Sequence, residues 1–427
     1  DKSGHRAAGR PLAVVRAASV SDVQTTMRIA SETGTPVVTR GAGTGLAGGA
    51  NTGEGEIALS VRDMNRVLEV RPDDLLAVVE PGILNADLGR ALAPYGVWWA
   101  PDPASREIST VGGNIATGAG GLLCAKYGVV RDAVLALDVV LADGRLISTG
   151  HRSVKGVTGY DLTALMIGSE GTLGVVVGAT LKLRRLVPGE TRTLTSQFPD
   201  VRTAAAGAAA VTASGAQPAI MELMDAVSLA AAHALLGLPA PTPGATQLTV
   251  QTDGVAAAAE QAAIAAVLTS AGGAVRLAAD DAEAAQLWAV RRAMHPAMES
   301  LGTALIEDVS VPRSALPAMF DEIARIEAQY DLTIPTVCHA GDGNLHPNFV
   351  FNGDEVPERV WQAADALFRA AIALGGTLTG EHGIGVLKSR WLADELGADQ
   401  WTLQRGIKTV FDPAGILNPG KVFAAQP

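Results

Sequence analysis

Along the chain, apolar residues recur with two different periods, which predict different elements. In residues 19–34 they lie three to four positions apart, as on one face of a helix, with Ser21 as the predicted N-cap and Gly34 just past the end. Residues 83–95 have a similar pattern, and 100–131 have neither period and are expected to be irregular. Short apolar runs predict strands at 36–40, 57–61, 75–82 and 171–186, and a hairpin at 133–147.

The pattern changes near residue 188. The predicted elements are helices within 200–235, a strand at 247–252, helices within 255–295, a strand at 305–312, a helix at 314–329, a hairpin at 334–351 and a helix at 356–374. This mixture predicts a separate α+β domain. The expected domains are 1–187, with subdomains at about 1–82 and 83–187, then 188–375, and a glycine-rich C-terminal segment at 376–427.

Composition and charge narrow the class of protein. The 427 residues are 48% hydrophobic and 18% charged, which is typical of a globular protein with two or three domains. A formal net charge of −11 argues against nucleic acid as a partner. The two cysteines, Cys124 and Cys338, form no CxxC pattern, and no apolar run reaches about 18 to 20 residues. We expect a cytoplasmic protein, with peripheral membrane association and a targeting segment ahead of Asp1 left open.

The loop TRGAGTGLAGGA, residues 39–50, contains glycines at GxGxG spacing after a predicted strand. A Rossmann dinucleotide site requires a helix directly after such glycines, whereas more glycines and a strand at 57–61 follow here. An NAD-dependent dehydrogenase is therefore not predicted. Successive backbone N–H groups can bind an anion without a helix, which favours a pyrophosphate near Arg40 over a plain turn. Further glycine runs at 109–128 and 167–178 predict an extended ligand.

Two of the seven histidines flank the turn in CHAGDGNLHP, and a third lies in TGEHGIG. In a hairpin, His339 and His346 would face each other with Cβ atoms about 4.5–5.5 Å apart, close enough to share a metal ion. Glu381 is the candidate third ligand, and such a set leaves coordination positions open for a substrate. Cys338 should point to the opposite face, into the core. The alternative is a tight Asp-Gly turn with bystander histidines.

Three segments resemble the FAD-binding domain of the vanillyl-alcohol-oxidase and p-cresol-methylhydroxylase type: RGAGTGLAGG, PDPASREISTVGGNIATGAGG and KGVTGYDLTALMIGSEGTLGVV. Three more are similar to the branch with the glycolate oxidase FAD subunit, FAD-linked D-lactate dehydrogenases and D-2-hydroxyglutarate dehydrogenase: CHAGDGNLHP, TGEHGIG and FDPAGILNPGK. The resemblance covers essentially the whole chain, with the motifs in matching order. It implies an α+β fold, in which a two-part FAD-binding domain carries a ferredoxin-like α+β cap domain.

The resemblance also implies where the cofactor lies. FAD would be noncovalent, because the first loop lacks the histidine through which some relatives attach it. The implied FAD-binding residues are Arg40, Gly41, Ala42, Gly43, Thr44, Gly45, Leu46, Gly48, Pro101, Asp102, Ser105, Thr110, Gly113, Asn114, Ala116, Gly121, Val175, Glu381 and Asn418.

Roles in catalysis follow from the same resemblance. The implied catalytic residues are His382, Arg291 and Asn348, and the implied ligands of a divalent metal (zinc, alternatively manganese or iron) are His339, His346 and Glu381. His382 would act as general base. Arg291 would bind the substrate carboxylate, with Arg292, about 100° further round the same helix, as its rival.

The implied activity is oxidation of a D-2-hydroxy acid to the 2-oxo acid, with hydride transfer to FAD. Ile306 stands where hydroxyglutarate-specific members place a lysine, so a D-lactate-like monocarboxylate is favoured over D-2-hydroxyglutarate or glycolate. The expected electron acceptor is a quinone, an electron-transfer flavoprotein, a partner subunit or oxygen, and a homodimer is expected. Two alternatives stay open: a nonredox FAD transferase resembling alkyl-dihydroxyacetone-phosphate synthase, and a noncatalytic flavin-binding subunit.

Overall fold

The computed structural model describes residues 3–5, 7–353 and 355–423. The chain divides into two compact units. The first comprises residues 1–121, 128–186 and 381–427, and the second comprises residues 122–127 and 187–380.

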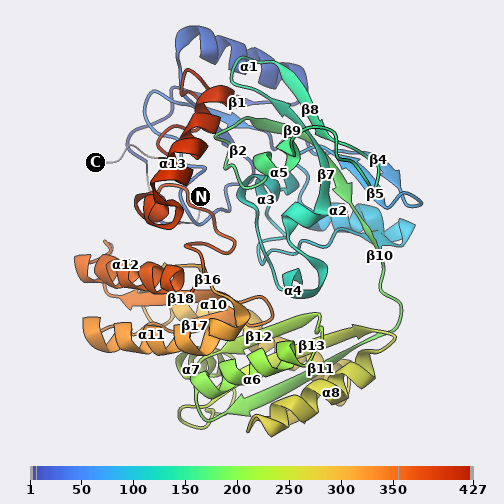
Figure 1. Cartoon of the computed structure of the whole chain (residues 1–427), viewed down its shortest axis with the longest axis vertical. Coiled ribbons are helices and arrows are strands. Elements are labelled where there is room, and N and C mark those ends of the chain that lie inside the picture. Colours follow the sequence, from blue (N-terminus) through green and yellow to red (C-terminus); the bar gives the residue numbers. More distant parts are fainter. Residues whose placement is uncertain (1–2, 6, 354, 424–427) are drawn as a thin grey trace. The chain divides into compact units, whose positions relative to one another are not determined.

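The first unit contains a three-stranded parallel sheet with the order β1-β3-β2, a five-stranded antiparallel sheet with the order β4-β5-β9-β7-β8, and the short pair β10-β6 (Figure 1). Its strands are β1 (Ala13–Arg16), β2 (Val37–Arg40), β3 (Ile57–Ser60), β4 (Val67–Arg71), β5 (Leu76–Val79), β6 (Val97–Trp98), β7 (Val134–Val140), β8 (Leu146–Gly150), β9 (Val175–Lys182) and β10 (Arg184–Arg185). Its α-helices are α1 (Val20–Thr33), α2 (Asn85–Leu92), α3 (Val111–Thr117), α5 (Leu162–Met166) and α13 (Leu392–Phe411), and its 3₁₀ helices are η1 (Ala93–Tyr95), η2 (Val130–Ala133) and η4 (Ser389–Trp391).

The predicted helix at 19–34 is confirmed as α1, with a correction at its start. Ser19 rather than Ser21 is the N-cap, because the Ser19 side chain accepts the backbone N–H of Asp22. Gly34 ends the helix in the left-handed region, with φ 65°. The buried face of α1 belongs to a core that also includes residues from both sheets.

Several helices lie where the pattern predicted none, and α3 and α13 are two of them. α3 begins after its N-cap Thr110, within the stretch expected to be irregular, and buries Val111 and Ile115. α13 lies in the C-terminal segment and contains a kink at Gly397. Glycine costs about 1 kcal/mol in a helix relative to alanine, which obscures such helices in sequence patterns until tertiary packing compensates.

The C-terminal segment adds a short extended stretch beside β2. The backbone N–H of Val37 donates to the Ile416 carbonyl at 2.7 Å, and that of Asn418 donates to the Val37 carbonyl at 2.8 Å. Ile416 and Leu417 are buried in the core around α1. The motif FDPAGILNPGK therefore packs against the same sheet whose strand β2 leads into the first glycine loop.

The second unit contains one eight-stranded antiparallel sheet with the order β14-β11-β13-β12-β17-β18-β15, in which β16 also pairs with β18. Its strands are β11 (Glu190–Phe198), β12 (Ile220–Met224), β13 (Thr246–Gly254), β14 (Ala274–Leu277), β15 (Thr303–Ile306), β16 (Val309–Ser310), β17 (Thr336–His339) and β18 (Asn344–Phe351). Its helices are α4 (Cys124–Tyr127), α6 (Val201–Ala213), α7 (Ala226–Leu235), α8 (Ala257–Ser270), α9 (Asp281–Arg292), α10 (Met294–Glu299), η3 (Arg313–Ala315), α11 (Leu316–Tyr330) and α12 (Glu358–Ala373).

Helices lie within 200–235 and 255–295, as predicted, but strands β12 and β14, which were not predicted, lie between them. Four of the five residues of β12, IMELM, favour helices locally, the exception being the isoleucine. All five residues of β12 are buried, and the strand pairs with β13 on one side and β17 on the other. Burial between two neighbouring strands outweighs the local helix preference.

The helices of the second unit form two groups. α6 packs against α8 and α11, and α11 packs against α12, whereas α7, α9 and α10 pack against one another. The second group shares a hydrophobic core with Met224 of β12 and Val337 of β17, on the sheet face that also carries Glu222 and His339. This face holds the polar residues described below.

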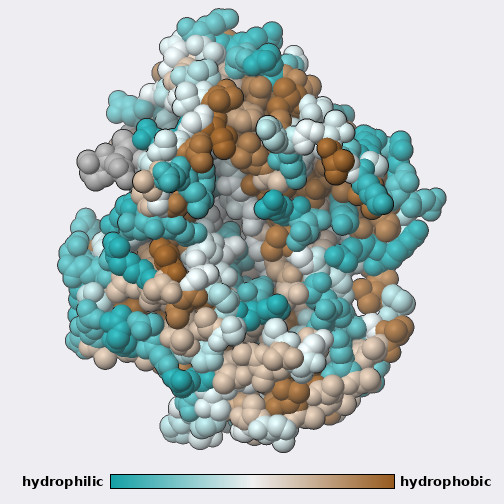
Figure 2. All heavy atoms as spheres, viewed as in Figure 1, coloured by the Kyte–Doolittle hydropathy of each residue, from teal (hydrophilic) through white to brown (hydrophobic). Residues whose placement is uncertain are grey.

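Among the described residues, no helix combines the length and the apolar content that crossing a membrane requires. Figure 2 shows hydrophobic residues interspersed with hydrophilic ones on the visible face of the molecule.

Candidate functional site

The first glycine loop connects two adjacent parallel strands without a helix, as predicted. β2 pairs in parallel with β3, and residues 41–56 form the connection. Inside this loop, the Arg40 guanidinium donates from Nη1 to the Ala50 carbonyl at 3.2 Å. Gly43 has a φ of 69°, and a Cβ at this position would collide with the Arg40 guanidinium. Arg40 therefore braces the loop from within, and Gly43 makes room for it.

The second glycine run meets the first at Gly41. A Cβ on Gly41 would collide with the hydroxyl of Thr110, the N-cap of α3, whose Oγ1 accepts the Gly113 N–H at 3.2 Å. Within the second run, a Cβ on Gly121 would collide with Asp102. Predicted FAD-binding residues thus come together in two places where a Cβ would collide: Gly41 with Thr110, and Gly121 with Asp102.

Asn418 joins the C-terminal segment to two other glycine runs. Its Nδ2 donates to the Gly49 carbonyl at 3.1 Å and to the Glu170 carbonyl at 2.6 Å. The first loop, the loop around Glu170 and the C-terminal segment are therefore held together by one side chain.

Four buried polar atoms of the first unit have no hydrogen-bond partner among the described residues: Thr39 Oγ1, Ser109 Oγ, Asn114 Nδ2 and Asn418 Oδ1. All four lie in or next to the glycine loops, and Asn114 and Asn418 are predicted FAD-binding residues. A buried polar group without a partner is costly, so such a cluster is typical of a site that a polar ligand completes. The donor and acceptor set fits a large polar cofactor such as FAD.

Two further predicted FAD-binding residues, Val175 and Glu381, lie outside the first two glycine runs. Val175 is fully buried, and its side chain belongs to the core between the sheets and α1. Glu381 lies beside the second glycine run, because a Cβ on Gly120 would collide with its carboxylate.

Glu170, which the sequence did not single out, fixes the loop that follows Glu381 and His382. Its two carboxylate oxygens accept the backbone N–H groups of Ile384 at 2.7 Å and Gly385 at 2.8 Å. Glu170 is buried. It therefore anchors the loop GIG through the backbone, whatever the side chains of the loop are.

The pH dependence of stability should reveal this carboxyl. Burial raises the pKa of Glu170 from 4.5 to about 7, against the effect of the two amides and of Lys388. Because the unfolded chain ionises at lower pH, the contribution of Glu170 to stability is complete below the unfolded pKa and is lost as the pH rises through the folded pKa. Glu170→Gln, which resembles the neutral carboxyl, should flatten the pH profile of the melting temperature between about pH 5 and 8.

Glu32→Gln, on the exposed side of α1, is the control and should keep the wild-type profile. Identical profiles for wild type and Glu170→Gln would contradict the assignment.

The predicted hairpin of the second unit is confirmed, but its register differs from the expected one. His339 pairs with Asn344, and His346 pairs with Val337, so the two histidines are diagonal rather than directly opposite. They still share one face of the sheet, because residues two apart on a strand point the same way. Their ring centroids are 5.0 Å apart. Cys338 is fully buried on the other face, as predicted.

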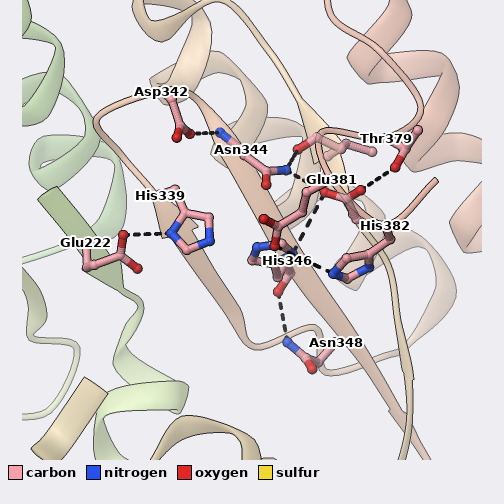
Figure 3. Close-up of polar contacts among 11 residues, drawn as sticks. Glu222, His339, Asp342, Asn344, His346, Asn348, Thr379, Glu381 and His382 are labelled. Atoms are coloured by element: carbon pink, nitrogen blue, oxygen red, sulfur yellow. Dashed lines mark hydrogen bonds and ion pairs between the residues drawn. The ribbon is translucent and has the colours of Figure 1, made fainter. Parts of the chain in front are cut away.

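His339, His346 and Glu381 each offer a ligand atom, and these atoms lie within 4.8 Å of one another. Glu381 directly follows Gly380, which ends the second unit and lies tightly against Asn344. The peptide chain itself thus holds Glu381 next to the hairpin. His382 follows, with its Nε2 at 3.8 Å from Glu381 Oε1. Figure 3 shows His339 and His346 on the hairpin, with Glu381 beside them.

Each hairpin histidine has a buried carboxylate behind it, which the sequence reading missed. His339 Nδ1 donates to Glu222 Oε1 at 2.7 Å (Figure 3). His346 Nδ1 lies 3.9 Å from Asp308 Oδ1, and Asp308 also accepts from Asn344 Nδ2 at 2.5 Å. Metal-binding histidines usually donate from their other ring nitrogen to a carboxylate, as His339 does to Glu222, whereas 3.9 Å between His346 and Asp308 is an ion-pair distance. The donor set and its surroundings therefore fit a divalent ion with nitrogen and oxygen ligands.

Of the two rival arginines on α9, Arg291 is the one directed into the protein. Its Nε donates to Glu222 Oε2 at 2.8 Å, and its side chain is 15% exposed. Arg292 is exposed and bonds the Ala285 carbonyl. Arg291 and His339 thus share one carboxylate, which places the arginine two hydrogen bonds from the candidate ion site.

Asn348 lies on the same face of β18 as His346. Its Nδ2 donates to the carbonyls of Pro335 and His346, at 3.1 and 2.8 Å, so the amide nitrogen is used by the backbone. Ile306 of β15 pairs with Asn348 and is half-buried. The apolar side chain of Ile306 therefore lies next to the polar residues Asn348 and His346 on this face of the sheet.

Comparison with known proteins identifies the class to which the chain belongs. Residues 11–150 match the family model of an FAD binding domain, and residues 187–422 match that of the C-terminal domain of FAD linked oxidases. The chain belongs to this family of FAD-linked oxidases and is an FAD-dependent oxidoreductase, as predicted.

Two relatives illustrate how the chain fits into the family. It is 40% identical to the glycolate oxidase subunit GlcD of Bacillus subtilis, over 97% of this chain and 89% of that protein. It is 35% identical to a D-lactate dehydrogenase of Anaerostipes hadrus, over 97% and 90%.

The solved structures support the predicted fold class. p-Cresol methylhydroxylase aligns with a TM-score of 0.77 at 16% identity, over 96% of this chain and 88% of that one. Alkyldihydroxyacetonephosphate synthase aligns with a TM-score of 0.72 at 18% identity, over 95% and 75%. Similarity at this level of identity concerns the fold alone, so it does not distinguish the oxidoreductase from the nonredox alternative; the sequence relatives do.

Proposed function

We propose that the protein oxidises a small D-2-hydroxy acid, with a D-lactate-like monocarboxylate as the preferred substrate, to the corresponding 2-oxo acid. The observation that supports this most directly is the chain of contacts from His339 through Glu222 to Arg291. It sets a carboxylate-binding arginine next to a cluster suited to bind a hydroxyl through a divalent ion. A 2-hydroxy acid presents these two groups on adjacent carbons. The relatives named as a glycolate oxidase subunit and a D-lactate dehydrogenase agree with this substrate class.

In this proposal, residues of the chain bind the substrate and remove the proton of its hydroxyl group, while the hydride goes to FAD. When bound, FAD supplies an acceptor for a hydride, and a divalent ion at His339, His346 and Glu381 supplies Lewis acidity. Arg291 binds the substrate carboxylate through its terminal amino groups. His382 takes the proton of the substrate hydroxyl, because an imidazole is a suitable general base near neutral pH.

The choice of a monocarboxylate rests on Ile306. A second carboxylate near β15 would need a cation or hydrogen-bond donors, because burying an unpaired charge is costly. Ile306 provides neither, and it lies beside Asn348 on the candidate site face. We therefore propose D-lactate or a similar short acid in preference to a dicarboxylate.

The electron acceptor is proposed to be another protein or a quinone. One relative is named as a subunit of glycolate oxidase, which suggests a partner subunit for this chain as well.

The test is an anaerobic visible spectrum of the purified flavoprotein before and after addition of D-lactate. We expect the flavin absorbance to bleach with D-lactate and much more slowly with L-lactate or D-2-hydroxyglutarate. Bleaching by D-2-hydroxyglutarate alone would contradict the role of Ile306. A spectrum that stays unchanged with every short D-2-hydroxy acid would contradict the proposed substrate class.

A further inference from the structure

We propose that Glu222 is a positioning residue that couples the ion cluster to the carboxylate-binding arginine, so that one buried side chain sets the geometry of both. The inference rests on the proposed function, because it assigns Arg291 and His339 to one substrate. It adds a residue outside every motif of the sequence, on the unexpected strand β12.

The position of Glu222 is fixed from three sides. Its side chain is 1% exposed, and its strand pairs with β13 and with β17, where its direct neighbour is His339. Oε1 accepts from His339 Nδ1 at 2.7 Å, and Oε2 accepts from Arg291 Nε at 2.8 Å. Each oxygen therefore serves a different functional residue.

The first consequence concerns His339. An ionised carboxylate only accepts hydrogen bonds, so the proton of the imidazole lies on Nδ1. The other ring nitrogen, Nε2, then carries the lone pair that a metal ion requires. Glu222 thus selects the tautomer of His339 that can act as a ligand.

The second consequence concerns Arg291. Because Nε is bound to Glu222, the guanidinium plane is fixed, and its two terminal amino groups have no hydrogen-bond partner among the described residues. A guanidinium with both terminal groups available binds a carboxylate in a bidentate manner. Glu222 thus presents a preorganised fork.

Asp308 provides a natural comparison. It is also buried, it lies behind the other hairpin histidine at 3.9 Å, and it accepts hydrogen bonds from Asn344 and Thr379, whereas Arg291 bonds Glu222 and not Asp308 among the described residues. Loss of the Asp308 charge should therefore affect the ion cluster alone, whereas loss of the Glu222 charge should affect ion and substrate together.

Glu222→Gln is the decisive variant, because an amide cannot serve both partners. If its NH₂ faces His339, the ring must accept at Nδ1, and the proton moves to the ligand nitrogen. If its NH₂ faces Arg291, two donors oppose each other and the arginine loses its anchor. We expect affinity for Mn²⁺ or Zn²⁺ about 10- to 100-fold weaker than that of wild type. We also expect a KM for D-lactate at saturating metal at least about 10-fold higher, with a smaller change in kcat.

The measurements use the FAD-loaded protein: metal dissociation constants by competition with a chromophoric chelator, and steady-state kinetics at saturating metal. Asp308→Asn, the control, should weaken metal binding and leave KM unchanged. Glu222→Asp keeps the charge and, because it is shorter, should retain one of the two bonds and therefore only one of the two wild-type values. If Glu222→Gln folds poorly, the metal affinity and the KM of Glu222→Asp test the coupling instead.

Wild-type metal affinity and KM in both Glu222 variants would overturn the coupling. So would a loss of metal affinity in Glu222→Gln with an unchanged KM at saturating metal. A wild-type protein that neither binds the metal nor oxidises D-lactate would instead overturn the proposed function, so the two failures are distinguishable.

Discussion

Replacing His382 with alanine should slow flavin reduction by D-lactate by about 10²–10⁴-fold, the usual contribution of a general base, while the protein keeps its FAD. The imidazole lies next to Glu381, with 3.8 Å between Nε2 and Oε1, and its side chain is 12% exposed. It is therefore sheltered and adjacent to the candidate ligand, where it can receive a hydroxyl proton. Alanine removes the acceptor without filling the space.

Stopped-flow absorbance of the anaerobic flavoprotein measures this rate directly. The control is His295→Ala, because the His295 side chain is 66% exposed and lies 3.6 Å from Glu299, which is also exposed. Wild-type rates in the His295 variant are expected. Reduction of the His382 variant at the full rate would end the assignment of His382 as the base.

Removing the metal should have a comparably large effect. The cluster of His339, His346 and Glu381 is suited to a divalent ion, and such an ion acting as a Lewis acid contributes several kcal/mol of transition-state stabilisation, or at least about 10²-fold in rate. Chelator treatment, or His346→Ala, should lower the rate of flavin reduction by this factor. Zinc or manganese should restore the chelated wild type but not the variant.

Metal content measured by mass spectrometry, alongside the reduction rate, tests this expectation. His151→Ala, in an exposed loop, serves as the control and should keep both metal and rate. Chelated protein that contains no metal and still reduces its flavin at the wild-type rate would exclude a catalytic ion at this cluster.

The sequence predicted those parts of the site that depend on residues near one another in the chain. The loop of residues 39–50 was predicted to join two strands without a helix, and β2 and β3 confirm it. Alternation along a strand correctly separated Cys338, which is buried in the core, from His339. The high density of glycines correctly indicated that the backbone and side chains lie close together in these loops, as Gly43 and Arg40 do.

The sequence predicted less where a local preference was reversed by burial. IMELM favours a helix, yet it forms β12 between two other strands. The predicted hairpin register was also wrong, by two residues, because turn length sets the register and the sequence pattern did not reveal where the turn begins and ends. In both cases the deciding interactions come from strands that are neighbours in space.

By itself, then, the sequence determined the class of fold, the glycine loops and the histidines that form the candidate site, because turns, glycine spacing and alternation are local properties. Only the tertiary structure decided that Glu222 stands behind His339, 117 residues away, and binds Arg291, 69 residues away. It likewise decided that Asn418 joins two distant loops, and that Glu170 holds Ile384. These contacts depend on strand order and burial. The partner of a buried carboxylate cannot be predicted from the sequence around it, because that partner is distant in the chain.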